Sequence, residues 1–183
     1  RDLIAFAKAK PDTLNFASAG NGSTLHLAAE MFRAEAGIRI VHVPFKGSGP
    51  AMASLLSGEV AMIFSATPPI LPHIKSGALR ALATTKPTRS RVLPDVPALA
   101  ELYPGFQIFI VNGILGPARV PARVVAKLNS EVAKAVVRPD VVQRFESLGV
   151  ETRTSTPEEL TAFIRTEIGR FGKLIRETGT RAD

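Results

Sequence analysis

The sequence contains no cysteine and no tryptophan, and it has one tyrosine and three histidines among 183 residues. The absence of cysteine excludes disulfide bonds, cysteine-ligated metal sites and a catalytic thiol. The histidines, His26, His42 and His73, do not occur in a metal-binding spacing such as His-Glu-x-x-His. We therefore expect no metal site and no cofactor.

The chain also lacks a long apolar run. The longest uncharged stretch, residues 102–118, contains two prolines and three glycines, and it is shorter than the roughly 20 apolar residues that span a membrane. Its pattern is typical of a buried strand and turn. The sequence does not open with a basic start, an apolar stretch and a small-residue cleavage site in succession, so we expect that any export signal has been removed or was never present in it.

Acidic residues are outnumbered by basic ones, and the formal net charge is +7. This excess is spread over both halves of the chain, without a basic run that alternates with aromatic residues. We therefore predict a basic soluble surface and no binding of nucleic acid.

Short apolar runs alternate with helix-period stretches from residue 12 to residue 84, and Gly, Pro, Ser or Thr marks each change. This pattern is typical of βαβ units and predicts an α/β fold with a parallel-rich sheet flanked by helices. The predicted strands are residues 14–17, 40–43, 60–64 and 79–83. The predicted helices between them are residues 23–36, 50–57 and 68–77, the last with Thr67 as N-cap.

The second part of the chain is predicted to be mainly helical. Residues 107–115 read as a long strand and residues 150–152 as a short one. Helices are expected over residues 121–137, 139–148 and 157–178, the last opened by a capping box of Thr156 and Glu159. These helices have wide apolar faces.

Parallel strands joined by right-handed crossovers place their carboxyl ends at one edge of the sheet. Three predicted helices begin at that edge, near Ser23, Pro50 and Pro68. Their free N–H groups and helix dipoles favour an anion there, and open α/β sheets bind ligands at this edge.

The loop of residues 18–24 is the most informative candidate site. Its glycines let a ligand approach the backbone, and its hydroxyls suit a carboxylate or phosphate. The alternative is a plain strand-to-helix turn in which Ser23 is the N-cap. The candidate ligand-binding residues of this loop are Ser18, Ala19, Gly20, Asn21, Gly22, Ser23 and Thr24.

Two further side chains are candidates at this edge. His26 lies one turn into the predicted helix, and Lys46 is the cation among the edge loops; each has a structural alternative, as a packed histidine and a solvated lysine. No paired carboxylates stand at the predicted edge, and the sequence contains no nucleotide-binding glycine motif and no Gly-x-Ser-x-Gly elbow. The sequence therefore predicts a binding protein with no catalytic residues.

Several motifs in order resemble those of one known family, the tripartite tricarboxylate transporter substrate-binding, or Bug, proteins. They are Ser18-Ala19-Gly20-x-Gly22-Ser23-x-x-His26-Leu27, His42-Val43-Pro44-Phe45-Lys46-Gly47, and Leu93-Pro94-Asp95-Val96-Pro97. The resemblance implies a periplasmic-binding-protein-like (type II) fold, in which two α/β lobes close on a small carboxylate. It also implies a periplasmic receptor that delivers its ligand to membrane transporter subunits.

The resemblance implies roles for particular residues. The loop of residues 18–24 matches the turn that holds one ligand carboxylate, and residues 111–113 match the crossing between lobes. Ser65 stands where many members have Asp or Asn, so an α-ammonium group would lack an acidic partner. We therefore favour a di- or tricarboxylate over an amino acid, and Ser65 and Thr67 complete the candidate site.

The resemblance also predicts the domain organisation. Residues 11–106 are expected to form a complete ligand-binding lobe. Residues 107–183 are expected to be the hinge strand and C-terminal helices of an incomplete second lobe, with residues 1–10 leading in. By itself such a fragment is expected to form a homodimer or to exchange elements with another copy. The alternative function is the effector-sensing domain of an intracellular transcriptional regulator.

Overall fold

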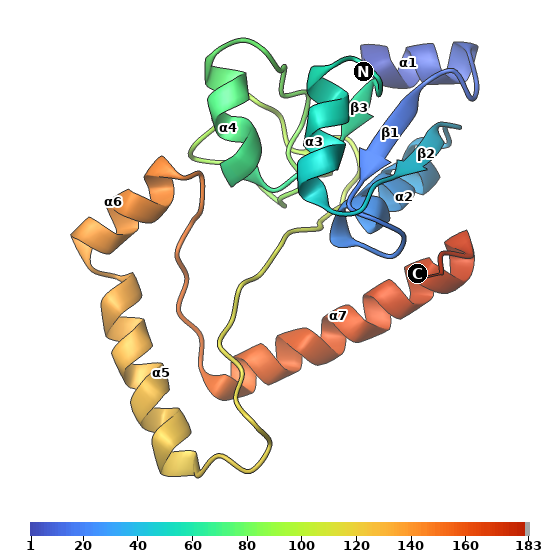
Figure 1. Cartoon of the computed structure of the whole chain (residues 1–183). Coiled ribbons are helices and arrows are strands. Elements are labelled where there is room, and N and C mark those ends of the chain that lie inside the picture. Colours follow the sequence, from blue (N-terminus) through green and yellow to red (C-terminus); the bar gives the residue numbers. More distant parts are fainter. Residues whose placement is uncertain (182–183) are drawn as a thin grey trace. The chain divides into compact units, whose positions relative to one another are not determined.

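A computed structural model describes residues 1–181 of the chain (Figure 1). These residues form two compact units. The first contains residues 1–110 together with the described residues from Phe171 onward, and the second contains residues 111–170. The boundary after Ile110 falls within the predicted strand of residues 107–115.

The first unit is the α/β part of the molecule. Its strands and helices alternate along the chain, as the βαβ pattern predicted. In order they are α1 (Asp2–Ala9), β1 (Asn15–Ser18), α2 (Thr24–Ala36), β2 (Val41–Pro44), α3 (Ser48–Leu56), β3 (Met62–Ile63), α4 (Thr67–Lys75) and the 3-10 helix η1 (Leu99–Glu101).

The three strands form a parallel sheet in the order β2-β1-β3. Phe16 of the central strand is in register with His42 on one side and with Met62 on the other. All three strands therefore end at the same edge, which confirms the predicted arrangement. Figure 1 shows the chain leaving this edge after each strand to enter the next helix.

The two faces of β1 pack against different helices because successive side chains of a strand point to opposite sides. Phe16 is fully buried in the larger apolar cluster, with Leu27 and Phe32 of α2. Ala17 is fully buried in the smaller cluster, with Ala51 of α3. The sheet is thus covered on both faces, as expected for a parallel sheet.

Both ends of α2 follow from local backbone chemistry. Ser23 caps the helix, since its Oγ accepts a hydrogen bond from the amide of His26 at 3.3 Å. Gly37 ends the helix in the left-handed conformation, with φ of 58°. For α4 the prediction was one residue late: Ala66 is the N-cap and Thr67 is the first helical residue, because the extended backbone ends at Ala66 (ψ 150°).

The predicted strand of residues 79–83 does not form. Only an isolated parallel bridge joins Thr84 to Ala98. A strand requires a neighbouring backbone partner, and the sheet of the described residues ends at β3 on this side. The apolar composition of this segment was therefore not sufficient to predict a strand.

The second unit contains α5 (Ala122–Val136), α6 (Pro139–Ser147) and the first part of α7 (Pro157–Thr178). The capping box is confirmed, because the amide of Thr156 donates to Glu159 at 2.8 Å and the amide of Glu159 donates to Thr156 Oγ1 at 3.1 Å. The predicted strands of residues 107–115 and 150–152 were wrong. Neither pairs with a backbone neighbour in a strand ladder within residues 1–181.

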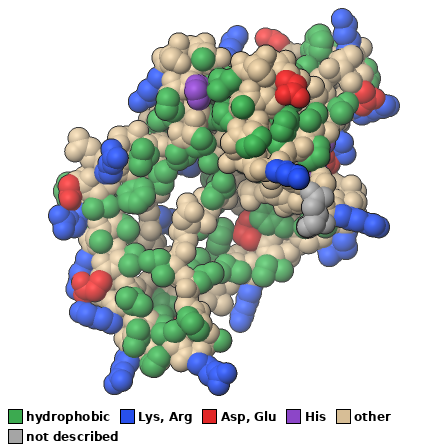
Figure 2. All heavy atoms as spheres, viewed as in Figure 1, with side chains coloured by type: hydrophobic (Ala, Val, Ile, Leu, Met, Phe, Trp, Pro, Cys, Tyr) green, Lys and Arg blue, Asp and Glu red, His purple; other side chains and the backbone are tan. Residues whose placement is uncertain are grey.

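Apolar side chains of the second unit face solvent. Ile114 and Leu115 retain 74% and 75% of their accessible surface, and Leu128 of α5 retains 54%. Figure 2 shows apolar side chains interspersed with Lys and Arg on the visible face. Among the described helices, none is long and apolar enough to cross a membrane.

Candidate functional site

The candidate site lies where β1, β2 and β3 end. The loops after β1 and β2 are in direct contact, since the amide of Phe45 donates to the carbonyl of Ser18 at 3.1 Å. A Cβ added at Gly20 would stand 3.5 Å from the Phe45 carbonyl oxygen, which is an ordinary van der Waals contact. The predicted gathering of these two loops is therefore present in the structure.

Hydrogen bonds between residues close in sequence define the loop of residues 18–24. The amide of Gly20 donates to Ser18 Oγ at 3.2 Å, and the amide of Ser23 donates to the carbonyl of Gly20 at 3.2 Å. Gly20 has a φ of 120° and Gly22 a φ of 74°. Residues with a Cβ rarely adopt the first of these conformations, so the loop path depends on glycine at position 20.

Burial divides the candidate residues of this loop into two kinds. Ser18 is fully buried, and its hydroxyl contacts Gly20 and His42, so it fixes the loop instead of facing its open side. The next five residues, 19–23, are half-buried, and Thr24 is exposed. The hydroxyls that can meet a ligand are therefore those of Ser23 and Thr24.

The start of α2 supplies the anion-binding groups. The first N–H groups of a helix lack intrahelical acceptors and lie at the positive end of its dipole. In α2 the amide of His26 donates a hydrogen bond to Ser23 Oγ. The amides of Thr24 and Leu25, the two helical residues before His26, are the first N–H groups of this helix. Ser23 Oγ accepts the bond from His26 and retains its own proton for donation to a ligand oxygen.

Three aromatic rings are stacked behind the loop. The rings of Phe16 and His42 have centroids 4.8 Å apart, and those of His42 and His26 are 3.9 Å apart at an interplanar angle of 9°. Nε2 of His42 lies 2.6 Å from Ser18 Oγ. The stack thus connects the buried face of β1 to the ligand loop through two histidines.

His26 is joined to the loop through Nδ1 of its ring. The amide of Gly22 donates to His26 Nδ1 at 3.1 Å, so Nδ1 carries no proton and the proton of the neutral ring is on Nε2. Nε2 faces Glu30 Oε1 at 3.6 Å, and the other oxygen of Glu30 pairs with Arg33 at 2.8 Å. His26 and Glu30 are 7% and 4% exposed. His26 is therefore a packed residue that shapes the loop.

The remaining candidates lie on the neighbouring loops. Lys46 is exposed on the loop after β2, immediately before Gly47, the N-cap of α3. Ser65 and Thr67 are half-buried and follow β3, on the other side of β1. The cation and these two hydroxyls thus flank the central loop from opposite sides.

A cavity of about 320 Å³ lies beside the central loop within the first unit. Its walls come from the loop and α2 on one side and from the residues that end and follow α7 on the other. They are Asn21, His26, Glu30, Arg33, Thr178, Gly179, Thr180 and Arg181. The cavity contains acidic and basic side chains and adjoins the half-buried part of the candidate loop.

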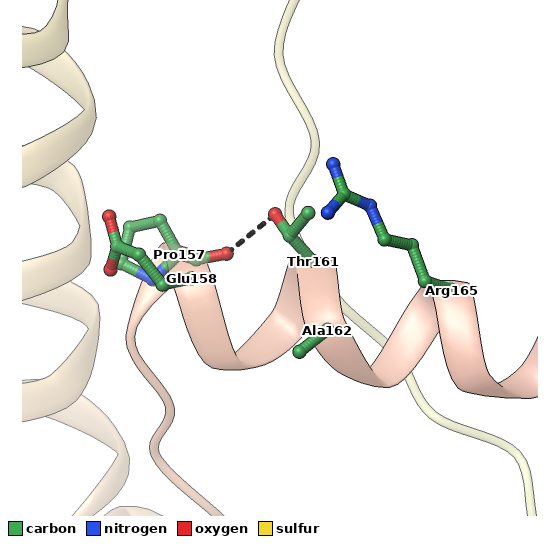
Figure 3. Close-up of a pocket in the computed structure, with 5 residues that line it drawn as sticks. All are labelled: Pro157, Glu158, Thr161, Ala162 and Arg165. Atoms are coloured by element: carbon green, nitrogen blue, oxygen red, sulfur yellow. Dashed lines mark hydrogen bonds between the residues drawn. The ribbon is translucent and has the colours of Figure 1, made fainter.

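A second hollow lies on the second unit, at the start of α7 (Figure 3). All five residues that line it belong to that one helix, and the hydroxyl of Thr161 donates to the carbonyl of Pro157 at 2.8 Å. This surface hollow lacks a second wall and contains no candidate residue.

The described residues 1–181 contain no group of three His, Asp or Glu side chains that could hold a metal ion. Two sets of contacts were not predicted from the sequence: the pairing of His42 with Ser18, and the chain from His26 through Glu30 to Arg33. The spacing of Glu30 one turn after His26 was the available signal. The contact of His42 with Ser18 joins residues 24 positions apart and leaves no local pattern.

Comparison with known proteins places the chain in a family. Residues 1–180 match the tripartite tricarboxylate transporter family receptor. Protein BugT of Bordetella pertussis is 38% identical over 180 residues, covering 98% of this chain and 55% of BugT. The chain thus spans about half the length of the curated relatives that it resembles.

Two solved structures have the same fold. "R. palustris Rpa4515 with adipate" is 30% identical with a TM-score of 0.85, covering 98% of this chain and 60% of that one. MatC from Rhodopseudomonas palustris with bound malate is 30% identical with a TM-score of 0.78, covering 95% of this chain and 60% of that one. The chain therefore belongs to the tripartite tricarboxylate transporter receptor family, and its parallel sheet flanked by helices is the fold of those solute-binding proteins.

Proposed function

We propose that this chain is part of a periplasmic receptor that binds a small dicarboxylate and delivers it to membrane transporter subunits without converting it. The observation that carries the proposal is the loop of residues 18–24, which lies at the carboxyl edge of the sheet and leads into the positive end of α2. Relatives with the same fold hold adipate and malate, which are both dicarboxylates.

In this proposal the first ligand carboxylate lies against the start of α2. Its oxygens accept hydrogen bonds from the amides of Thr24 and Leu25 and from the hydroxyls of Ser23 and Thr24. Charge-assisted bonds of this kind are stronger than neutral ones. Ala19, Gly20 and Asn21 provide the close approach of the backbone, with Gly20 holding the turn.

The second carboxylate is assigned to the flanking loops. Lys46 supplies a cation, and Ser65 and Thr67 supply hydroxyls. Since Ser65 carries no charge, this side of the site offers no partner to an α-ammonium group. A dicarboxylate is therefore preferred to an amino acid of similar length.

The proposal assigns residues 11–106 to one complete lobe and residues 107–183 to the hinge and the helices of the other. Residues 111–113 are the crossing, and the carboxylate is enclosed when the lobes close. A receptor of this kind requires binding groups only, and the candidate site combines amides, hydroxyls and one cation.

Calorimetric titration of the full-length protein with adipate, malate, citrate and glutamate tests the proposal. We expect a dicarboxylate to bind most tightly and to be recovered unchanged. The variants Ser23→Ala and Thr24→Val should each weaken its binding by roughly tenfold to a hundredfold, as expected for loss of one hydrogen bond to a charged group.

Ser57→Ala is the matched control, because this exposed serine at the end of α3 lies away from the carboxyl edge. Its affinity should equal that of the wild type. If both site variants also retained wild-type affinity for the bound carboxylate, the site assignment would be wrong.

A further inference from the structure

The strongest unexplained feature of the first unit is a pair of stacked histidines joined to the ligand loop. His26 and His42 lie on different elements, α2 and β2, yet their ring centroids are 3.9 Å apart. Each ring also contacts the loop through a nitrogen atom: His26 through Gly22, and His42 through Ser18. The two contacts hold both ends of the segment of residues 18–22.

The contact of His26 with Gly22 exists in only one protonation state. The amide of Gly22 is a donor, so His26 Nδ1 must present a lone pair. A protonated imidazole carries hydrogens on both nitrogens. Protonation of His26 would therefore place two donors against each other at 3.1 Å and break this bond.

The contact of His42 with Ser18 tolerates either state. Ser18 Oγ accepts from the amide of Gly20 at 3.2 Å and lies 3.1 Å from the Gly20 carbonyl oxygen. The hydroxyl proton can point to that carbonyl while Oγ accepts from His42 Nε2. His42 thus supports the ring of His26 by stacking, and the proton-sensitive contact is the one at Gly22.

Charged groups face His26 from several elements. On α2, Glu30 lies 3.6 Å from Nε2 and favours the charged ring, although it already pairs with Arg33. On β2, His42 disfavours a charge on its stacked neighbour, because two imidazolium rings repel each other. Arg181, after α7, lines the same cavity and adds positive charge. Burial of His26 also opposes its ionisation.

We infer that His26 is a pH-sensitive positioning residue, which holds the ligand loop through Gly22 only as a neutral imidazole and lowers carboxylate affinity when it is protonated. This inference rests on the proposed function, since it concerns the loop assigned to the carboxylate. Release of Gly22 changes the direction of the peptide groups at residues 20–23, because the hydrogen bonds within the loop set the conformations of its glycines.

The test measures malate and adipate affinity of the full-length protein between pH 7.5 and 5.5, with three histidine variants. The wild type should bind roughly fivefold to tenfold more weakly at the acidic end, as expected for one lost hydrogen bond. In His26→Asn the amide oxygen stands where Nδ1 was and can accept from Gly22 without titrating. This variant should keep the neutral-pH affinity and lose most of the pH dependence.

Two comparison variants separate the roles of the histidines. His26→Leu removes the acceptor and should bind weakly at every pH. His73→Asn changes the third histidine, which lies on α4 outside the stack, and should retain the wild-type profile. If His26→Asn followed the wild-type profile, or if the wild-type affinity did not depend on pH, the inference would be overturned.

A ligand-free measurement distinguishes failure of this inference from failure of the proposed function. Hydrogen exchange of the peptide containing residues 18–25, corrected for the intrinsic pH dependence of exchange, should show faster opening at pH 5.5 than at pH 7.5 in the wild type but not in His26→Asn. This result without any carboxylate binding would reject the proposed function alone. If hydrogen exchange of this peptide in the wild type were the same at pH 5.5 and pH 7.5, the pH-sensitive role of His26 would be rejected even if a carboxylate bound.

Discussion

The guanidinium of Arg89 donates two hydrogen bonds to the carboxylate of Glu101, from Nε at 2.8 Å and from Nη2 at 2.9 Å. The same carboxylate accepts from the amide of Ala98 at 2.9 Å. This pair joins the long proline-containing connection of residues 86–98 to η1. It therefore ties a loop to the element that contributes Leu99 to the main core.

The hydrogen bond from Arg89, with that from Ala98, lowers the pKa of Glu101 from its ordinary value of 4.5 to about 2. The pKa of Glu101 is lower in the folded state than in the unfolded state. The stabilisation by this carboxylate is therefore fully present at pH values above the unfolded-state pKa, and it is lost as the pH falls towards 2. Urea unfolding at several acidic pH values should show a shallower loss of stability in Arg89→Ala than in the wild type. Arg91→Ala, at a nearby exposed arginine, is the control and should follow the wild type.

Gly37 and Gly49 should respond to alanine with opposite signs. Gly37 ends α2 at φ 58°, and no atom lies within 4 Å of an added Cβ, so only the backbone conformation opposes the change. Gly37→Ala should lower the free energy of unfolding by roughly 1 kcal/mol. Gly49 lies in α3 without positive φ and with equal space, so Gly49→Ala should raise it by roughly 0.5 kcal/mol. Equal effects in denaturant titrations would contradict the assigned conformations.

Phe16 supports both the core and the histidine stack. Its side chain is fully buried and its ring lies 4.8 Å from that of His42. Phe16→Ala should cost roughly 3–5 kcal/mol of unfolding free energy through the cavity that it leaves. Phe6→Ala, at a ring that is 44% exposed, should cost far less in the same chemical denaturation experiment. Comparable losses would show that Phe16 is not central to the core.

The exposed apolar side chains of the second unit predict self-association of the 183-residue chain. None of the described residues of α5, α6 and α7 is buried, and Ile168 of α7 is 68% exposed. Apolar patches of this kind are unusual on monomers. Light scattering should therefore give a mass above that of a monomer, because two copies form a homodimer or exchange elements. The variant Leu128→Lys should reduce this mass, whereas the control Lys127→Ala should leave it unchanged. A monomer with sharp cooperative unfolding would refute this prediction.

The net charge of +7 should not lead to binding of nucleic acid. Lys and Arg are scattered over the visible face in Figure 2. The sequence contains no basic run that alternates with aromatic residues, the pattern expected of a platform on which bases stack. A gel-shift titration near physiological salt should show no complex. A tight complex whose affinity falls steeply with added salt would contradict this expectation.

The sequence determined the order of elements in the first unit because the signals for that order are local. Glycine, proline and hydroxyl residues mark each change from strand to helix, and the N-cap at Ser23 and the stop at Gly37 follow from backbone chemistry within one turn. The motifs from Ser18 to Lys46 likewise indicated the family, which the comparisons show. The βαβ pattern, with right-handed crossovers, placed the candidate loop at the carboxyl edge, where the structure has it.

The tertiary structure decided which apolar segments have partners. Residues 79–83 and 107–115 have the composition of strands, yet they form no ladder in the described chain, because pairing depends on a neighbour distant in sequence. The stack of His26 on His42 and the bond of His42 to Ser18 have the same origin. They arise only when β1 and β2 lie in register, so composition and spacing could suggest a ligand loop but could not show what holds it in place.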